Sequence, residues 1–148
     1  MKDFNSMTHS IVIDADREKV WKTLWEDETY RKWTAAFMEG SHAVSDWNEG
    51  SKILFKGPDN NGMVSMIAEK IEPELMTFRH LGVLKDGVED TTSEEVKAWA
   101  GSREKYVLKD QDGHTHLEVV MDISPEYEQM FDEIWPKALL RVKELSEK

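Results

Sequence analysis

The two residues best suited to chemistry are His80 and Glu104, each within a segment of alternating apolar and polar residues. If these segments pair as strands with Gly82 opposite Ser102, His80 lies opposite Glu104, and such partners are about 5 Å apart at Cβ. A carboxylate there could fix the tautomer of the imidazole, which would then act as an acid or base or anchor a polar group of a ligand. The pattern also fits a solvent-facing pair at the edge of the sheet, or a structural histidine with no role in binding.

Large apolar side chains are expected around this pair. Phe78 shares a strand face with His80, Tyr106 shares one with Glu104, and a terminal helix presents further aromatic residues. Met and Trp adapt readily to ligands, which favours an open pocket over side chains that only fill one another's space. The residues expected to line the pocket are Trp47, Met66, Phe78, His80, Glu104, Tyr106, Met130, Phe131, Ile134 and Trp135.

Other kinds of site have no signature in the chain. It contains no Cys, which excludes disulfides and thiolate chemistry and fits a reducing cytoplasm. No HExxH or Cys-based metal spacing is present, no Gly-x-Ser-x-Gly elbow, and no glycine-rich phosphate loop. We therefore expect no metal and no cofactor, and assign no catalytic residue.

Composition and length bound the possible partners. The net charge of −11 disfavours nucleic acid and anionic membrane surfaces, since both are bound through clustered Lys and Arg. No apolar run approaches the ~18 residues of a membrane span, and no export signal is visible at the N-terminus. The 148 residues suit a single domain over 1–148, which we expect in the cytoplasm.

The elements that must position these residues follow from periodicity. Residues 9–13 form a short strand, and Asp14 or Asp16 can cap the first of two short helices. Alternating segments between residues 41 and 123 predict antiparallel strands joined by short turns. Apolar residues at i, i+3, i+4 and i+7 from 124 to 148 predict one long amphipathic helix. The fold class is α+β, with a curved sheet of about seven strands around the last helix.

Residues 83–101 are the exceptional connection. The segment is long for a hairpin loop and rich in Asp and Glu, and Thr92 or Ser93 could cap a helical turn within it. It is either a solvated surface or a docking face for a protein partner.

Several motifs resemble one known superfamily. Residues 11–21 (IVIDADREKVW), with Trp33 after them, are similar to the opening of the SRPBCC or START-like superfamily, the helix-grip fold of birch-pollen-allergen-type proteins. Residues 131–139 (FDEIWPKAL), 85–90 (KDGVED), 99–101 (WAG) and 104–106 (EKY) are similar to its branch related to the activator of the heat-shock-protein-90 ATPase.

The resemblance implies a helix-grip fold with a hydrophobic tunnel between sheet and closing helix. Members of the superfamily bind lipids, sterols, polyketides and plant hormones, and a few are cyclases or dehydratases. We therefore expect binding of a small hydrophobic or amphipathic ligand. The alternatives are a polyketide cyclase or dehydratase that uses the same tunnel, and a co-chaperone-like module that binds a protein partner through the acidic 83–101 segment.

Overall fold

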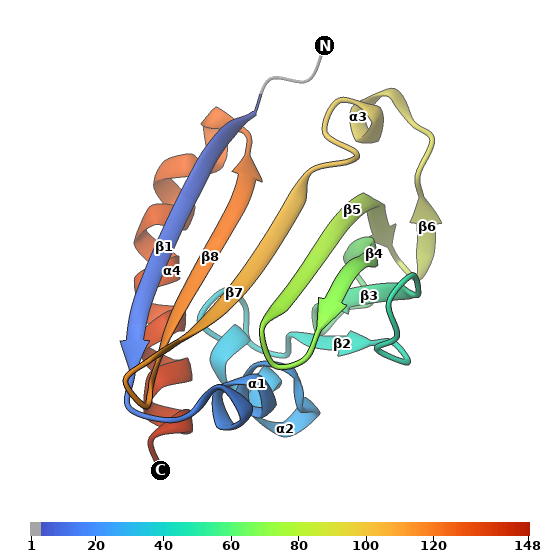
Figure 1. Ribbon diagram of the computed structural model, residues 1–148. Coiled ribbons are helices and arrows are strands. Elements are labelled where there is room, and N and C mark those ends of the chain that lie inside the picture. The colour runs from blue at the N-terminus through green and yellow to red at the C-terminus, as the bar shows by residue number, and fades with distance from the viewer. Residues whose placement is uncertain (1–3) are drawn as a thin grey trace.

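The computed structural model describes residues 4–148 (Figure 1). In chain order the elements are β1 (Asn5–Ile13), α1 (Arg17–Trp25), α2 (Asp27–Thr34), β2 (His42–Val44), β3 (Lys52–Lys56), β4 (Gly62–Ile71), β5 (Leu75–Lys85), β6 (Val88–Asp90), α3 (Glu94–Lys97), β7 (Arg103–Gln111), β8 (His114–Ile123) and α4 (Pro125–Ser146). Among these residues no helix combines the length and the apolar character that a membrane crossing requires.

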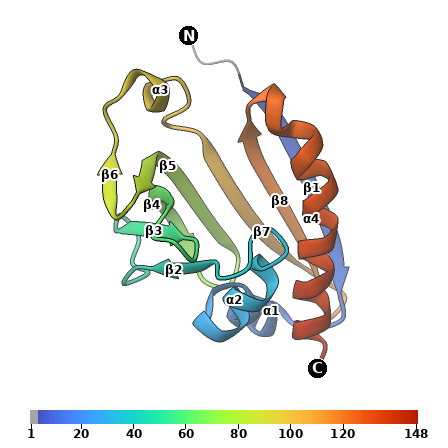
Figure 2. The same cartoon turned by 180° about the vertical axis from the view of Figure 1, so that it is seen from behind.

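The strands form one antiparallel sheet in the order β1-β8-β7-β5-β4-β3-β2, with β6 paired to the end of β5. Helix α4 lies along one face of this sheet, while α1 and α2 close one end (Figures 1 and 2). We call the face covered by α4 the inner face and the opposite one the outer face. The expected α+β helix-grip fold is confirmed, and β6 is the strand that the sequence pattern did not predict.

The two short helices are fixed by a cap and by a buried hydrogen bond. Asp16 accepts from the backbone N–H of Lys19 at 2.9 Å, which satisfies one of the free donors at the start of α1. The indole N–H of Trp33 in α2 donates to the carbonyl oxygen of Leu24 in α1 at 3.1 Å. Trp25 at the end of α1 is thereby held against the inner face of the sheet.

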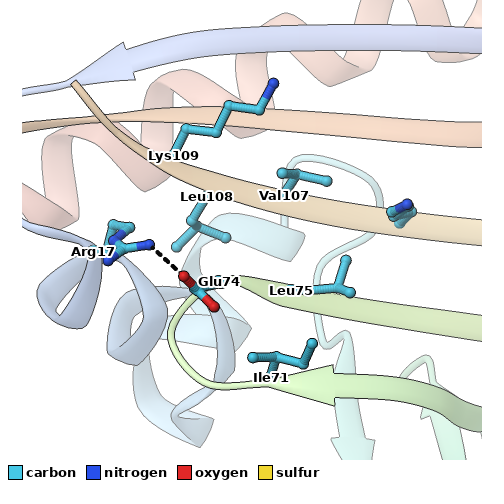
Figure 3. A pocket seen from close by; sticks show the side chains of 8 residues that line it. Arg17, Ile71, Glu74, Leu75, Val107, Leu108 and Lys109 are labelled. Carbon is cyan, nitrogen blue, oxygen red and sulfur yellow. Dashed lines mark hydrogen bonds and ion pairs between the residues drawn. The ribbon is translucent and has the colours of Figure 1, made fainter.

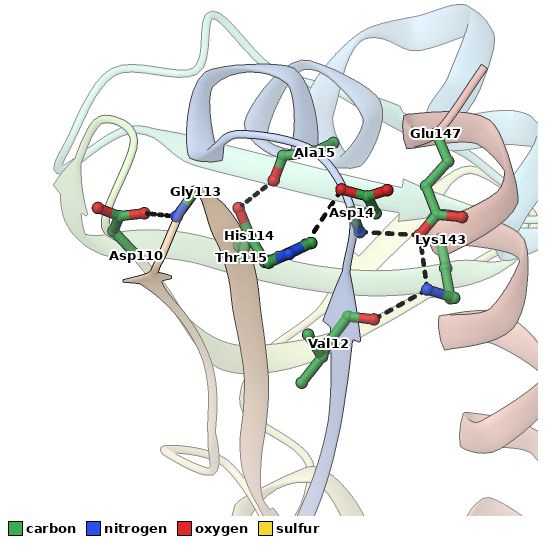
Figure 4. Close-up of polar contacts among 9 residues, drawn as sticks. All are labelled: Val12, Asp14, Ala15, Asp110, Gly113, His114, Thr115, Lys143 and Glu147. Carbon is green, nitrogen blue, oxygen red and sulfur yellow. Dashed lines mark hydrogen bonds and ion pairs between the residues drawn. The ribbon is translucent and has the colours of Figure 1, made fainter.

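Helix α4 is packed unevenly along its length. Its buried residues all lie from Trp135 onward, whereas Tyr127 and Met130 in the first half are 49% and 47% exposed. Polar contacts fasten its C-terminal end to the end of β1 (Figure 4). Glu147 accepts from the backbone N–H of Asp14 at 2.8 Å, and Lys143 donates to the carbonyl oxygen of Val12 at 3.1 Å. The first half of α4 therefore leaves its apolar side partly open.

Strand β5 connects the inner face with the acidic 83–101 segment. Its first half pairs with β7 and its last three residues pair with β6. Ser93 caps α3 by accepting from the N–H of Val96, and Val96 is buried, so the segment has the short helix expected from its sequence. The pairing of β4 with β5 shifts register between Val64 and Ser65, an irregularity of the kind that often lies next to functional sites.

Candidate functional site

The side chains of His80 and Glu104 meet on the inner face, but in a different register from the expected one. Glu104 lies opposite Phe78 rather than His80, because β5 and β7 are displaced by two residues from the predicted alignment. A displacement of two keeps every side chain on its original face. His80 and Glu104 are therefore diagonal neighbours, with Nε2 and Oε1 3.4 Å apart.

Two further residues extend this contact into a row of four polar side chains. Ser65 of β4 lies opposite His80, and its Oγ is 2.7 Å from Nδ1 of the imidazole. On the other side, the hydroxyl of Tyr106 donates to Oε2 of Glu104. Ser65 and Tyr106 are buried, whereas the side chains of His80 and Glu104 are 13% and 22% exposed. The two central members can reach a ligand, and the two outer members position them.

The burial of Ser65 limits the chemistry of this row. Ser, His and Glu in hydrogen-bonding sequence would suit nucleophilic catalysis, but a nucleophile has to touch its substrate. The hydroxyl of Ser65 is enclosed by the sheet. The geometry therefore suits anchoring or proton transfer at His80 and Glu104, not attack by Ser65.

The charge of Glu104 influences two tyrosines. Burial, and next the negative charge of Glu104, raise the pKa of Tyr106 well above the usual range of a phenol. The same two causes, in the same order, raise the pKa of Tyr30. Both phenols are therefore neutral at physiological pH. Among residues 4–148, His80 is the one ion-pairing partner within 4.0 Å of the Glu104 carboxylate.

Aromatic rings surround the polar row. Trp25 is at the centre, with its ring centroid 4.9 Å from Tyr106, 5.3 Å from Phe78 and 5.8 Å from Trp47. Trp135 of α4 approaches Tyr106 from the other side, at 6.1 Å. Edge-to-face contacts of this kind stabilise an aromatic core, so the inner face below α4 is filled mainly by rings.

Two tryptophans in this cluster have unsatisfied polar atoms. The indole nitrogens of Trp25 and Trp135 are buried and lack a hydrogen-bond partner. Buried polar groups in native proteins nearly always have a partner, so each exception requires an explanation. Both rings contact the ring of Tyr106, so the two indoles belong to the aromatic cluster around the polar row.

The ten expected lining residues are only partly brought together. Phe78, Tyr106 and Trp135 are in the buried core with the polar pair beside them, and Trp47 and Phe131 pack against that core partly exposed. Three residues do not join it. Met66 lies opposite Arg79 and Lys52 and so points to the outer face, Met130 is about half exposed, and Ile134 is partly buried outside the core cluster.

Sequence reasoning missed several members of the site. Ser65 was not predicted because the irregular pairing of β4 with β5 determines that it lies opposite His80. Its position as a lone Ser within an apolar strand could have indicated a special role. Trp25 lies among the apolar residues of α1, but its position over the sheet depends on how α1 packs. Phe37 and Phe55 follow no clean periodicity, yet Phe37 lies 6.1 Å from Phe131 and Phe55 lies 6.3 Å from His80 between ring centroids.

The two hollows found in the described surface both lie outside this cluster, so neither is the hydrophobic tunnel expected between the sheet and the closing helix. One, of about 380 Å³, is on the outer face between β4, β5, β7 and Arg17 (Figure 3). The other, of about 240 Å³, is beside the C-terminal end of α4. A ligand on the inner face would have to displace partly exposed rings such as Phe37 and Phe131. Within the described part of the chain, no three His, Asp or Glu side chains gather closely enough to hold a metal ion.

Solved structures with the same fold come from several bacteria. The Aha1 dimer from Colwellia psychrerythraea superposes with a TM-score of 0.74 at 18% identity, over 97% of this chain and 96% of that one. ChR145 from Cytophaga hutchinsonii gives 0.71 at 21% identity, over 97% and 94%. CalU16 from Micromonospora echinospora gives 0.65 at 18% identity, over 97% and 76%. At these identities the likeness shows the fold.

The sequence itself carries the family relationship. No curated protein matches the chain. The family model described as activator of Hsp90 ATPase homolog 1-like protein matches residues 14–147, which include both the inner-face site and helix α4. The chain belongs to this family.

Proposed function

We propose that the protein binds a small amphipathic molecule on the inner face, next to the first half of α4. The observation that supports this most directly is a partly exposed imidazole and carboxylate set within a wall of aromatic rings. Sites for small molecules are mostly apolar with a few placed polar groups. His80 and Glu104 would orient the ligand, and the rings around Trp25 would bind its apolar body.

The chemistry of the polar row narrows the class of ligand. Ionised Glu104 can only accept hydrogen bonds, so it favours a hydroxyl or an ammonium group and repels a carboxylate. The free indole N–H groups of Trp25 and Trp135 can donate to a carbonyl or hydroxyl oxygen. The ligand that fits is an oxygenated apolar compound without negative charge.

One fold relative is consistent with a role in small-molecule chemistry. DynU16 comes from the dynemicin biosynthetic locus and superposes with a TM-score of 0.66 at 14% identity, over 94% of this chain and 46% of that one. Because less than half of the DynU16 chain is covered, the likeness says nothing about the activity of the whole DynU16 protein. It supports small organic compounds as the first ligands to test.

The test is an NMR titration with 2-naphthol, and with 2-naphthoate as a matched anion. We expect 2-naphthol to shift the indole N–H signals of Trp25 and Trp135, and 2-naphthoate to bind at least tenfold more weakly. Glu104→Gln should reduce that preference, because it removes the charge at constant shape. Glu118→Gln in β8 is the control, since Glu118 lies opposite Val107, on the outer face. The site would be excluded if the preference for 2-naphthol over 2-naphthoate were unchanged in Glu104→Gln, or if neither compound shifted the indole N–H signals.

A cyclase or dehydratase is the alternative, and the contact between His80 and Glu104 favours it. An imidazole held by a carboxylate is a suitable general base. Each compound that binds in the titration should be followed for chemical change over hours. Conversion that stops in His80→Gln, with binding retained, would establish the enzyme; stable compounds throughout would leave binding alone.

A further inference from the structure

Cations are concentrated on the outer face of the sheet, in a protein whose net charge is −11. Outward residues alternate along β5 and β7, with Arg79 directly opposite Arg103 and Thr77 opposite Lys105. Lys109 continues the row along β7. We call Arg79, Arg103, Lys105 and Lys109 the basic face; all four are exposed.

These four cations have no acidic partner. Among residues 4–148, no carboxylate oxygen lies within 4.0 Å of any of them, although Arg17 pairs with Glu74 at 3.1 Å on the same side of the sheet. Acidic residues also lie on this face: Glu69 accepts from the hydroxyl of Thr77, Asp122 accepts from the backbone N–H of Arg103, and Glu118 lies opposite Val107, diagonal to Lys105 and Lys109.

Their arrangement is costly for the isolated chain. Like charges directly opposite one another on paired strands are destabilising, as Arg79 and Arg103 are here. Lysines often protect sheet edges from aggregation, but β5 and β7 are central strands, so edge protection does not explain them. An anionic partner would relieve the repulsion.

Apolar side chains lie between the cations. The hollow of about 380 Å³ on this face is lined by apolar Ile71, Leu75 and Val107, by Lys105 and Lys109, and by the ion pair of Arg17 and Glu74 (Figure 3). Ile71 is 51% exposed. The surface therefore combines positive charge with an apolar floor.

We propose that the outer face docks an acidic, amphipathic segment of a partner protein. Alternate residues on a strand are separated by roughly 6.7 Å, so the row from Arg103 to Lys109 spans about 20 Å. That length suits an extended segment of about six residues better than a compact small molecule. Its carboxylates would pair with the basic face, and its apolar residues would cover Ile71 and Val107.

The experiment measures binding of a fluorescent ten-residue peptide composed of Glu and Leu, by anisotropy at low salt. The test variant is the double substitution Arg103→Glu with Lys105→Glu. The control is Lys22→Glu with Lys137→Glu, which changes the net charge equally at exposed positions in α1 and α4. We expect the test variant to lose affinity about tenfold or more, and the control to change it less than twofold.

Further variants separate the contribution of charge from that of apolar contact, and they control for misfolding. Ile71→Ser should weaken the Glu and Leu peptide but not a peptide of Glu and Ser. Arg103→Gln with Lys105→Gln should give an intermediate loss, with an unchanged far-UV circular dichroism spectrum. Glu104→Gln on the inner face should leave peptide binding intact, so this proposal and the ligand site can fail independently.

Three results would overturn the proposal. The first is equal weakening by the test and control pairs, which would mean that only net charge matters. The second is tighter binding of a single-stranded oligonucleotide or of anionic lipid vesicles at the same residues. The third is no peptide binding at low salt.

Discussion

Ser65 Oγ and His80 Nδ1 are 2.7 Å apart, which fixes the imidazole so that Nε2 points to Glu104. The serine is fully enclosed, so its role is to hold the ring rather than to touch a ligand. Because Ser65 holds Nδ1, the imidazole presents Nε2 to the inner face in each of its protonation states.

Replacing Ser65 with Ala should release the imidazole. Nδ1 of the partly buried ring would lose its partner, so we expect a loss of about 1 kcal/mol in the free energy of unfolding. The nitrogen chemical shifts of His80 should also move toward a mixture of tautomers, and affinity for 2-naphthol should fall. Thr at this position retains the hydroxyl and is the control. An unchanged His80 spectrum in Ser65→Ala would show that the contact does not orient the ring.

Tyr30 and Tyr106 should resist ionisation in alkali. Burial raises the pKa of Tyr30 and of Tyr106, and the negative charge of Glu104 adds to both shifts. In absorbance titration at 295 nm we expect neither phenol to ionise until the protein unfolds. Because both folded pKa values lie above the unfolded value of about 10, these groups support folding below pH 10 and lose that contribution as the pH rises further. In Tyr106→Phe, the part of the absorbance change that appears only on unfolding should be smaller. Full ionisation of Tyr30 and Tyr106 in the folded wild-type protein would contradict their burial.

The C-terminal anchor of α4 should weaken in acid. Hydrogen bonds from the Lys143 ammonium and then from the Asp14 N–H lower the pKa of Glu147. A carboxyl with a lowered folded pKa stabilises the fold above its unfolded value and loses that effect as the pH falls through the folded pKa. Glu147→Gln should therefore remove part of the fall in Tm between neutral and acidic pH. Glu144→Gln, one turn away and exposed, is the control and should leave the pH profile unchanged.

Local sequence patterns predicted the helices and strands well, whereas the geometry of the candidate site depends on long-range packing. The spacing of Trp135, Ala138 and Val142 was enough to place α4, because a helix face is visible in the sequence. The faces of His80 and Glu104 were also correct, since alternation survives a shift of two residues. Their register was wrong because pairing beyond Arg79 is set by the turn that carries α3, which no local signal describes. Met66 was assigned to the wrong face because apolar residues stand on both faces of this part of β4, so the sequence did not decide which one points inward.

The contact between β5 and the end of β6 depends on a glycine. A Cβ built on Gly82 would lie 2.0 Å from the carbonyl oxygen of Asp90 and 2.9 Å from Cγ2 of Thr91, so Gly82→Ala forces these strands apart. The displaced contact is backbone, which cannot move as a flexible side chain does. We expect amide exchange to accelerate across the acidic 83–101 segment while β1 and β8 stay protected. Leu81→Ala, at the neighbouring position, is the control and should leave the exchange of that segment close to wild type. Unchanged exchange in Gly82→Ala would mean that the close approach of β6 is not maintained in solution, and that the segment is free of β5.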